Sequence, residues 1–265
     1  MPPPGEYAGP AFVYALGQID PRFPTLAVEK EFAQVAGQSD ASGLTDRQAL
    51  QALLSEPGNR YLARQLCWVL TIEGVDTYIL QPHVRGDIDL LVDAVRSKPR
   101  RTDLDVVIGM LGPLAPAELC NGLMVPIVVF DQLYSFDVDT LLDAIPRPDD
   151  AESDQWDAAV EEIFSRITQM NDNAGATDAD RALNYLSVRC PGIYHKAAEK
   201  YAANASLTTV EVRPSPLTGT RKIVDVVFAF TDRSTDVTDK HFVRVDVTEE
   251  FPFLAAKLAP YFERG

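Results

Sequence analysis

The apolar residues in the first half of the chain fall into short continuous runs and helical stripes. Runs of this kind predict five strands, at 12–19, 61–72, 75–80, 104–111 and 125–132. The last two are apolar at nearly every position, which is typical of strands buried on both faces. Apolar residues spaced at 3.6 positions predict three helices between these strands, at 26–35, 44–54 and 87–95. Glu73-Gly74 between the second and third runs predicts a hairpin turn.

The second half changes from helical to alternating patterns. Apolar stripes predict helices at 137–145, 156–167, 177–190 and 193–203. Thr177 followed by Asp180 resembles a capping box and should begin the third of these helices. Alternation then predicts the strands 208–213, 222–230 and 241–248 as a half-exposed antiparallel meander. Leu254, Leu258 and Tyr261 share one helical face, so a short helix is predicted at 251–262.

The order of these elements predicts an α+β fold. We expect a single compact body with two antiparallel-rich β regions, at about 12–132 and 206–249, and a helical segment at 153–203 between them. Residues 1–10 are Pro-rich without an apolar pattern and are expected to be a flexible leader or a linker remnant. The remainder, 11–265, is interpreted as the domain. Pro146 to Asp150 is the clearest break, and it separates two alternative sub-lobes, 11–148 and 151–265.

The net charge of the chain limits the kinds of partner that it can bind. The 24 Lys and Arg against 39 Asp and Glu give a formal net charge of −15. A field of this sign repels phosphate backbones and anionic membrane surfaces, and it favours basic or cationic partners. The sequence holds no run of about 18 apolar residues and no secretory signal pattern at its start. We therefore predict a cytoplasmic protein with no nucleic-acid or membrane partner.

The three cysteines predict a reducing environment. Cys67, Cys120 and Cys190 include no CxxC pair, and they are not expected to form a disulfide framework. Cys67 lies in an apolar run and should be buried and unreactive. Cys120 lies in a loop beside a tight turn, so it should be the first thiol to react with a labelling reagent.

Motifs for catalysis or cofactor binding are missing from the sequence. It contains no P-loop, no GxGxxG after a strand and no GxSxG, and Ser135, Ser187 and Ser206 stand in apolar or helical contexts. The histidines, His83, His195 and His241, are widely spaced. A zinc site from the three cysteines and one histidine is chemically allowed, but no local ligand pair supports it. The carboxylate pairs Asp103 with Asp105 and Asp131 with Asp137 are interpreted as solvated faces. No catalytic, cofactor-binding or metal-binding residue is therefore assigned.

Several long strings resemble the C-terminal domain shared by PatG and PatA, the maturation proteins of cyanobactin biosynthesis. They are 12–24, 27–32, 59–69, 118–126, 171–177 and 243–253. In that family the domain is of unknown function, and the protease or macrocyclase activity belongs to a separate subtilisin-like domain. The resemblance therefore supplies no catalytic residues, but it implies a role in maturing ribosomally made peptides.

Three functional hypotheses remain open. The first is a non-catalytic accessory or recognition domain that binds precursor peptide, a pathway enzyme or a second copy of itself. The second is an unrecognised peptide-modifying enzyme that uses Cys120, His83 or His195. The third is a structural zinc module. Under the first hypothesis, the chain alone should neither cleave nor macrocyclise a precursor peptide.

Overall fold

The computed structural model describes residues 11–37, 46–100, 102–143, 153–168 and 173–262. It confirms the α+β class, because its two sheets are largely antiparallel and its helices occur in groups between groups of strands. The chain divides into two compact units, Met1–Phe136 and Asp137–Gly265. The predicted leader at 1–10 and the predicted break at 146–150 lie outside the described residues.

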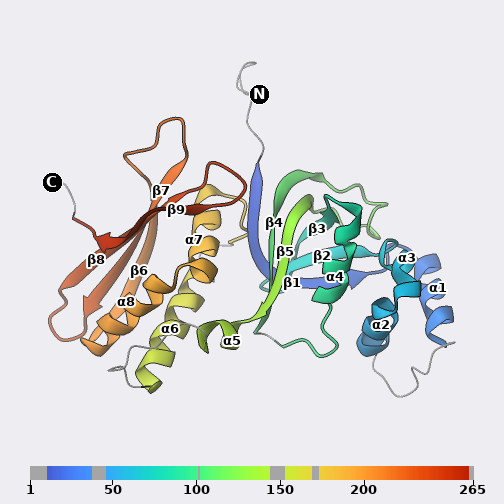
Figure 1. Cartoon of the computed structure of the whole chain (residues 1–265), viewed down its shortest axis with the longest axis horizontal. Coiled ribbons are helices and arrows are strands. Elements are labelled where there is room, and N and C mark those ends of the chain that lie inside the picture. The colour runs from blue at the N-terminus through green and yellow to red at the C-terminus, as the bar shows by residue number, and fades with distance from the viewer. Residues whose placement is uncertain (1–10, 38–45, 101, 144–152, 169–172, 263–265) are drawn as a thin grey trace. The chain divides into compact units, whose positions relative to one another are not determined.

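The described strands of the first unit close into a barrel (Figure 1). They are β1 (Phe12–Arg22), β2 (Cys67–Ile72), β3 (Val75–Pro82), β4 (Asp103–Leu114) and β5 (Pro126–Asp137), and their order around the barrel is β1-β2-β3-β5-β4. Strand β1 runs antiparallel to β2 and to β4, and β2 runs antiparallel to β3, whereas β3 and β5 are parallel. This closed order with one parallel pair is that of the oligonucleotide- and oligosaccharide-binding (OB) fold.

Helices occupy two of the connections in the barrel. Between β1 and β2 lie α1 (Leu26–Gly37), α2 (Asp46–Ser55) and α3 (Arg60–Ala63), and between β3 and β4 lies α4 (Ile88–Ala94). The strand predicted at 61–72 was therefore too long. Leu62 and Ala63 bury fully from a helical turn, and the strand begins only at Cys67.

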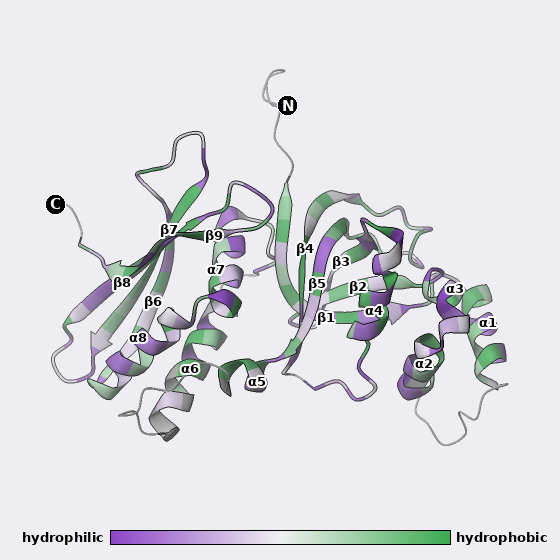
Figure 2. Cartoon of the chain, in the orientation of Figure 1, coloured by the Kyte–Doolittle hydropathy of each residue, from purple (hydrophilic) through white to green (hydrophobic). Residues whose placement is uncertain are grey.

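The second unit is an antiparallel sheet with helices on one face (Figure 1). The sheet has the order β6 (Ala205–Pro214), β7 (Ile223–Asp232), β8 (Thr238–Asp246) and β9 (Phe253–Pro260). The helices are α5 (Val138–Asp143), α6 (Ser153–Thr168), α7 (Asp178–Arg189) and α8 (Pro191–Ala202). In Figure 2, α7 and α8 alternate between hydrophilic and hydrophobic colours, as expected of helices with one buried face. The capping box of Thr177 with Asp180 is confirmed.

Two predictions for this sheet were wrong. Residues 253–260 form strand β9 rather than a helix, because they pair with β8 from Asp246 to His241. Strand β7 is buried over Val224–Phe230, not half-exposed. It lies between β6 and β8, and its outer side is shielded by long side chains such as Arg244, which pairs with Asp225 at 2.7 Å.

Candidate functional site

The strand register decides which side chains of β2 and β3 point out of the barrel. Asp20 is ion-paired with Arg47 of the external helix α2, and its partner across the ladder is Val69. Val69 in turn faces Ile79 on β3. Because side chains alternate along a strand, Cys67, Val69 and Ile79 point outward, whereas Leu70 points into the barrel. In OB folds the face of β2 and β3 and the adjoining loops bind oligonucleotides and oligosaccharides, so this face is the candidate binding site.

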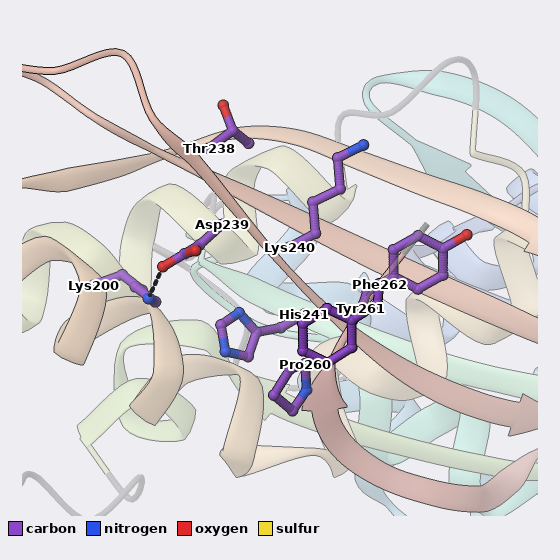
Figure 3. A pocket seen from close by; sticks show the side chains of 8 residues that line it. All are labelled: Lys200, Thr238, Asp239, Lys240, His241, Pro260, Tyr261 and Phe262. Carbon is purple, nitrogen blue, oxygen red and sulfur yellow. Dashed lines mark hydrogen bonds and ion pairs between the residues drawn. The ribbon is translucent and has the colours of Figure 1, made fainter. Parts of the chain in front are cut away.

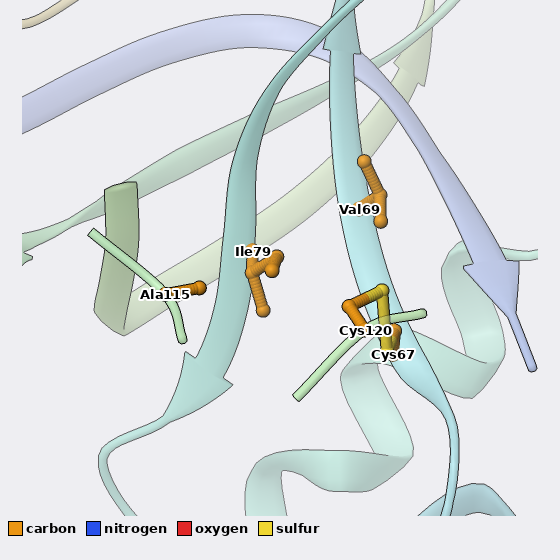
Figure 4. Close-up of a cluster of buried hydrophobic side chains, with 5 residues drawn as sticks. All are labelled: Cys67, Val69, Ile79, Ala115 and Cys120. Carbon is orange, nitrogen blue, oxygen red and sulfur yellow. A yellow bond between two sulfur atoms is a disulfide. The ribbon is translucent and has the colours of Figure 1, made fainter. Parts of the chain in front are cut away.

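A loop of the chain covers this face. Residues 115–125, here called the strap, connect β4 to β5. Ala115 and Cys120 of the strap form one buried cluster with Cys67, Val69 and Ile79 (Figure 4). Leu119, Leu123 and Val125 pack against the cluster. Val69 and Ile79 are consequently no more than 2% exposed, although they lie on the outside of the barrel.

The strap forms its backbone hydrogen bonds within itself. Gly122 N donates to Ala117 O at 2.7 Å, Leu123 N donates to Cys120 O at 2.9 Å, and Ala115 N donates to Val125 O at 2.9 Å. Gly122 has a φ of 89°, a value that favours glycine and allows the tight turn. The strap is therefore a self-contained turn that contacts the barrel mainly through side chains.

A disulfide joins Cys67 of β2 to Cys120 of the strap, with a Cα–Cα distance of 5.7 Å (Figure 4). The expectation of three unpaired thiols was therefore wrong. Cys67 is buried, as predicted, but Cys120 is only 3% exposed and is not the reachable thiol that its loop position suggested. The free cysteine is Cys190, where burial raises the pKa of the thiol. Sequence spacing could not pair residues 53 positions apart.

Two predicted candidates meet beside the covered face. His83 follows β3, and its Nδ1 lies 2.6 Å from Oδ1 of Asp131 on β5. The side chain of His83 is 56% exposed, so the carboxylate can orient the imidazole while the ring stays open to solvent. Asp131 was interpreted only as part of a solvated face. The parallel pairing of β3 with β5 brings it to His83, and no local motif indicates that pairing.

The second unit has a pocket of about 530 Å³ where the C-terminal end of α8 meets β8 and β9 (Figure 3). Lys200 donates to Asp239 at 2.7 Å across its rim. Burial lowers the pKa of His241, and the nearby Lys196 and Lys200 lower it further, whereas Asp239 and Glu199 oppose them. The pocket is lined by Lys200, Thr238, Asp239, Lys240, His241, Pro260, Tyr261 and Phe262.

Comparison with known families finds a family model that matches part of the chain. Residues 150–261 match the family model described as PatG C-terminal. The match places a PatG C-terminal domain at residues 150–261. A solved structure titled "PatG Domain of Unknown Function" superimposes with a TM-score of 0.76 at 23% identity, covering 96% of this chain and 99% of that one. That likeness shows a shared fold. None of the curated proteins compared with the chain matches it.

The second unit contains the pocket, His195 and Cys190. The His195 ring lies 5.6 Å from that of Trp156, in the packing between α8 and α6. Ser187 is buried and donates to Asn184 O, and Ser206 accepts from Arg233. These contacts are structural, and they bring no base to either serine.

The remaining candidates lie in the barrel. Asp105 is only 5% exposed, so its assignment to a solvated face was wrong. It accepts from Ile19 N at 2.9 Å and from Ser135 Oγ at 2.5 Å. Among the described residues no three His, Cys, Asp or Glu side chains converge as metal ligands. No helix in the described ranges is long and apolar enough to span a membrane.

Proposed function

We propose that the chain is a non-catalytic recognition domain that binds a peptide during cyanobactin-type maturation of ribosomally made peptides. The observation that carries this proposal is the OB-type barrel, whose outer β2–β3 face carries the apolar side chains of Val69 and Ile79. The pathway comes from the PatG C-terminal family, and the compartment that we propose, the cytoplasm, comes from the sequence.

The distribution of reactive side chains supports binding over catalysis. A nucleophile needs a base within hydrogen-bond reach. Cys120 is bound to Cys67 and Cys190 is buried, so neither sulfur is an exposed nucleophile. The net charge of −15 adds a preference for peptides with basic segments, and that preference should weaken as salt rises.

The proposal is tested with the purified chain and the precursor peptide of its own pathway. Isothermal titration should show saturable binding, and mass spectrometry should recover the peptide uncleaved and linear. A chain that binds neither this peptide nor a maturation enzyme in size-exclusion chromatography would contradict a recognition role.

The His83–Asp131 pair favours one alternative, an enzyme that uses His83 as a general base. The exposed imidazole with an oriented ring is the arrangement such a base requires. Under this alternative, the chain alone would change the mass of the precursor peptide, and His83→Ala would abolish the change. Lys257→Ala, a substitution on the exposed face of β9, is the matched control.

A further inference from the structure

The Cys67–Cys120 disulfide belongs to a chain that we propose to be cytoplasmic. Reducing pathways in that compartment keep most thiols unpaired, and the disulfides that do occur there are mainly catalytic or redox-sensing. This disulfide ties the strap to the candidate binding face, so its redox state controls the one covalent link between them.

We propose that the outer face of β2 and β3 binds an extended apolar peptide, and that the strap is its built-in cover. The disulfide locks the cover, and reduction releases it. That the partner is a peptide rests on the recognition role proposed above. The redox-controlled opening of the strap, here called the gate, does not rest on that role.

The reduced strap is built to leave as a unit. Its backbone hydrogen bonds close on the strap itself, so lifting it takes no backbone partner from the barrel, while it exposes the strap's own hydrogen bonds to solvent. Cys67 Sγ lies 3.1 Å from Leu119 O, so the thiol formed on reduction already has an acceptor when the strap is down. Closed and open forms are then both compatible with the reduced chain, whereas the oxidised chain is held closed.

The surface under and beside the strap indicates the partner. Val69, Ile79 and the side of Ile127 present an apolar strip once Leu119 and Leu123 leave it. Leu114 and Met124 stand at the two ends of the strap, and they are 61% and 59% exposed. With the strap lifted, these side chains and the strip would form one contiguous exposed apolar patch, and such patches mark interaction sites. A peptide with leucine-like side chains can replace those of the strap, and the net charge of the chain disfavours a nucleic acid.

The switching reaction is a thiol–disulfide exchange. One thiolate of an external dithiol attacks a sulfur of the Cys67–Cys120 disulfide, which forms a mixed disulfide and releases the other cysteine. The second thiolate of the dithiol then attacks the mixed disulfide and releases the remaining cysteine of the chain. Two electrons and two protons pass to Cys67 and Cys120, and the dithiol becomes a disulfide. Because Cys67 and Cys120 are 5% and 3% exposed, the reaction proceeds through transient openings of the strap.

The gate is tested on the full chain equilibrated in buffers of oxidised and reduced dithiothreitol. Thiol counting after denaturation should give one thiol at the oxidising limit and three at the reducing limit. Hydrogen exchange with mass spectrometry should then show strap amides exchanging at least about tenfold faster in the reduced chain, while β2 and β3 stay protected. Cys120→Ser should reproduce the reduced state under both conditions. Cys190→Ser, which alters a buried cysteine outside the disulfide, should switch like the parent chain.

The binding face is tested by replacing 116–124 with a Gly-Ser linker of equal length. A fluorescent synthetic peptide of sequence 114–125 carrying Cys120→Ser should bind this variant, but it should not bind the oxidised parent chain. The same peptide with Leu119→Asp and Leu123→Asp is the control and should not bind.

Three results would overturn the inference: a count of three thiols throughout, strap exchange that ignores the redox state, or β2 and β3 losing protection together with the strap. In the last case the disulfide would be a structural staple rather than a lock. Failure of the precursor peptide to bind a chain whose strap does open would instead reject the recognition role and leave the gate standing.

Discussion

Arg181 on α7 donates from Nη1 to the carbonyl oxygen of Val247 at 2.8 Å, across 66 positions of sequence. Its second terminal nitrogen reaches the carbonyls of Glu249 and Glu250 in the same loop. The side chain of Arg181 is only 3% exposed. One cation therefore donates to three carbonyls of the loop between β8 and β9, and burial lowers the pKa of Arg181 without removing its charge.

Arg181→Met should destabilise the second unit by about 3 kcal/mol, because it fills the same space but leaves buried carbonyls without donors. Urea unfolding followed by tryptophan fluorescence measures the change, since Trp156 lies in that unit. Lys257→Met, on the exposed side of β9, should change the free energy of unfolding by less than about 0.5 kcal/mol. Equal effects of the two substitutions would remove Arg181 from this role.

Loss of the disulfide should weaken the first unit. Its sequence separation of 53 residues predicts that Cys120→Ser lowers the free energy of unfolding by up to about 4 kcal/mol under oxidising conditions, through the entropy of the unfolded chain. Under reducing conditions the parent and the variant should unfold at nearly the same urea concentration. A deficit of the same size in reducing buffer would mean that Cys120 acts by packing alone.

The burial of Asp105 should make the stability of the barrel depend on pH. Desolvation raises its pKa above the usual 3.8, although the hydrogen bonds from Ser135 and Ile19 oppose the shift. A folded-state pKa above the unfolded value favours folding at low pH, and this contribution is lost as pH rises through the folded pKa. Relative to Asp105→Asn, the parent chain should thus lose stability as pH rises above about 4. Urea midpoints of both proteins measured in steps from pH 4 to 7 supply the test; a constant difference would contradict it.

Local patterns predicted most elements but not how the first unit closes. The apolar runs at 104–111 and 125–132 identified β4 and β5, and the capping box at Thr177 located the start of α7. The parallel pair β3–β5 and the pair β1–β4 join segments far apart in sequence, and no local period encodes them. The barrel, the strap and the contacts of His83 and Cys120 all depend on those pairs. At 253–260, Leu254 and Leu258 fit both a helical stripe and one side of a strand, and the free edge of β8 selects the strand.

The lysines around the pocket should control the charge of His241. Lys200→Met removes a positive charge and leaves Asp239 without that partner, and both effects favour the protonated imidazole. The pKa of His241 should therefore rise in this variant and fall in Asp239→Asn. NMR titration of the histidine ring resonances distinguishes the two directions, and His83 in the first unit serves as the internal reference. Shifts of the same sign in both variants would place His241 outside the influence of this ion pair.

The barrel should also depend on Gly109, where β4 passes close to β5. A Cβ at this position would lie 2.2 Å from Val129 O and 2.5 Å from Phe130 Cα, both of them backbone atoms that cannot rotate away. Gly109→Ala should therefore force the two strands apart and destabilise the first unit by about 3 kcal/mol. Gly86→Ala is the matched control, because a Cβ at Gly86 meets no atom within 4 Å. Thermal unfolding of the two variants compares them directly, and an intact Gly109→Ala barrel with an unchanged midpoint would contradict the close approach of β4 and β5. Because the strap is anchored where β4 ends and β5 begins, Gly109→Ala should also speed hydrogen exchange in the strap of the oxidised chain, whereas Gly86→Ala should not.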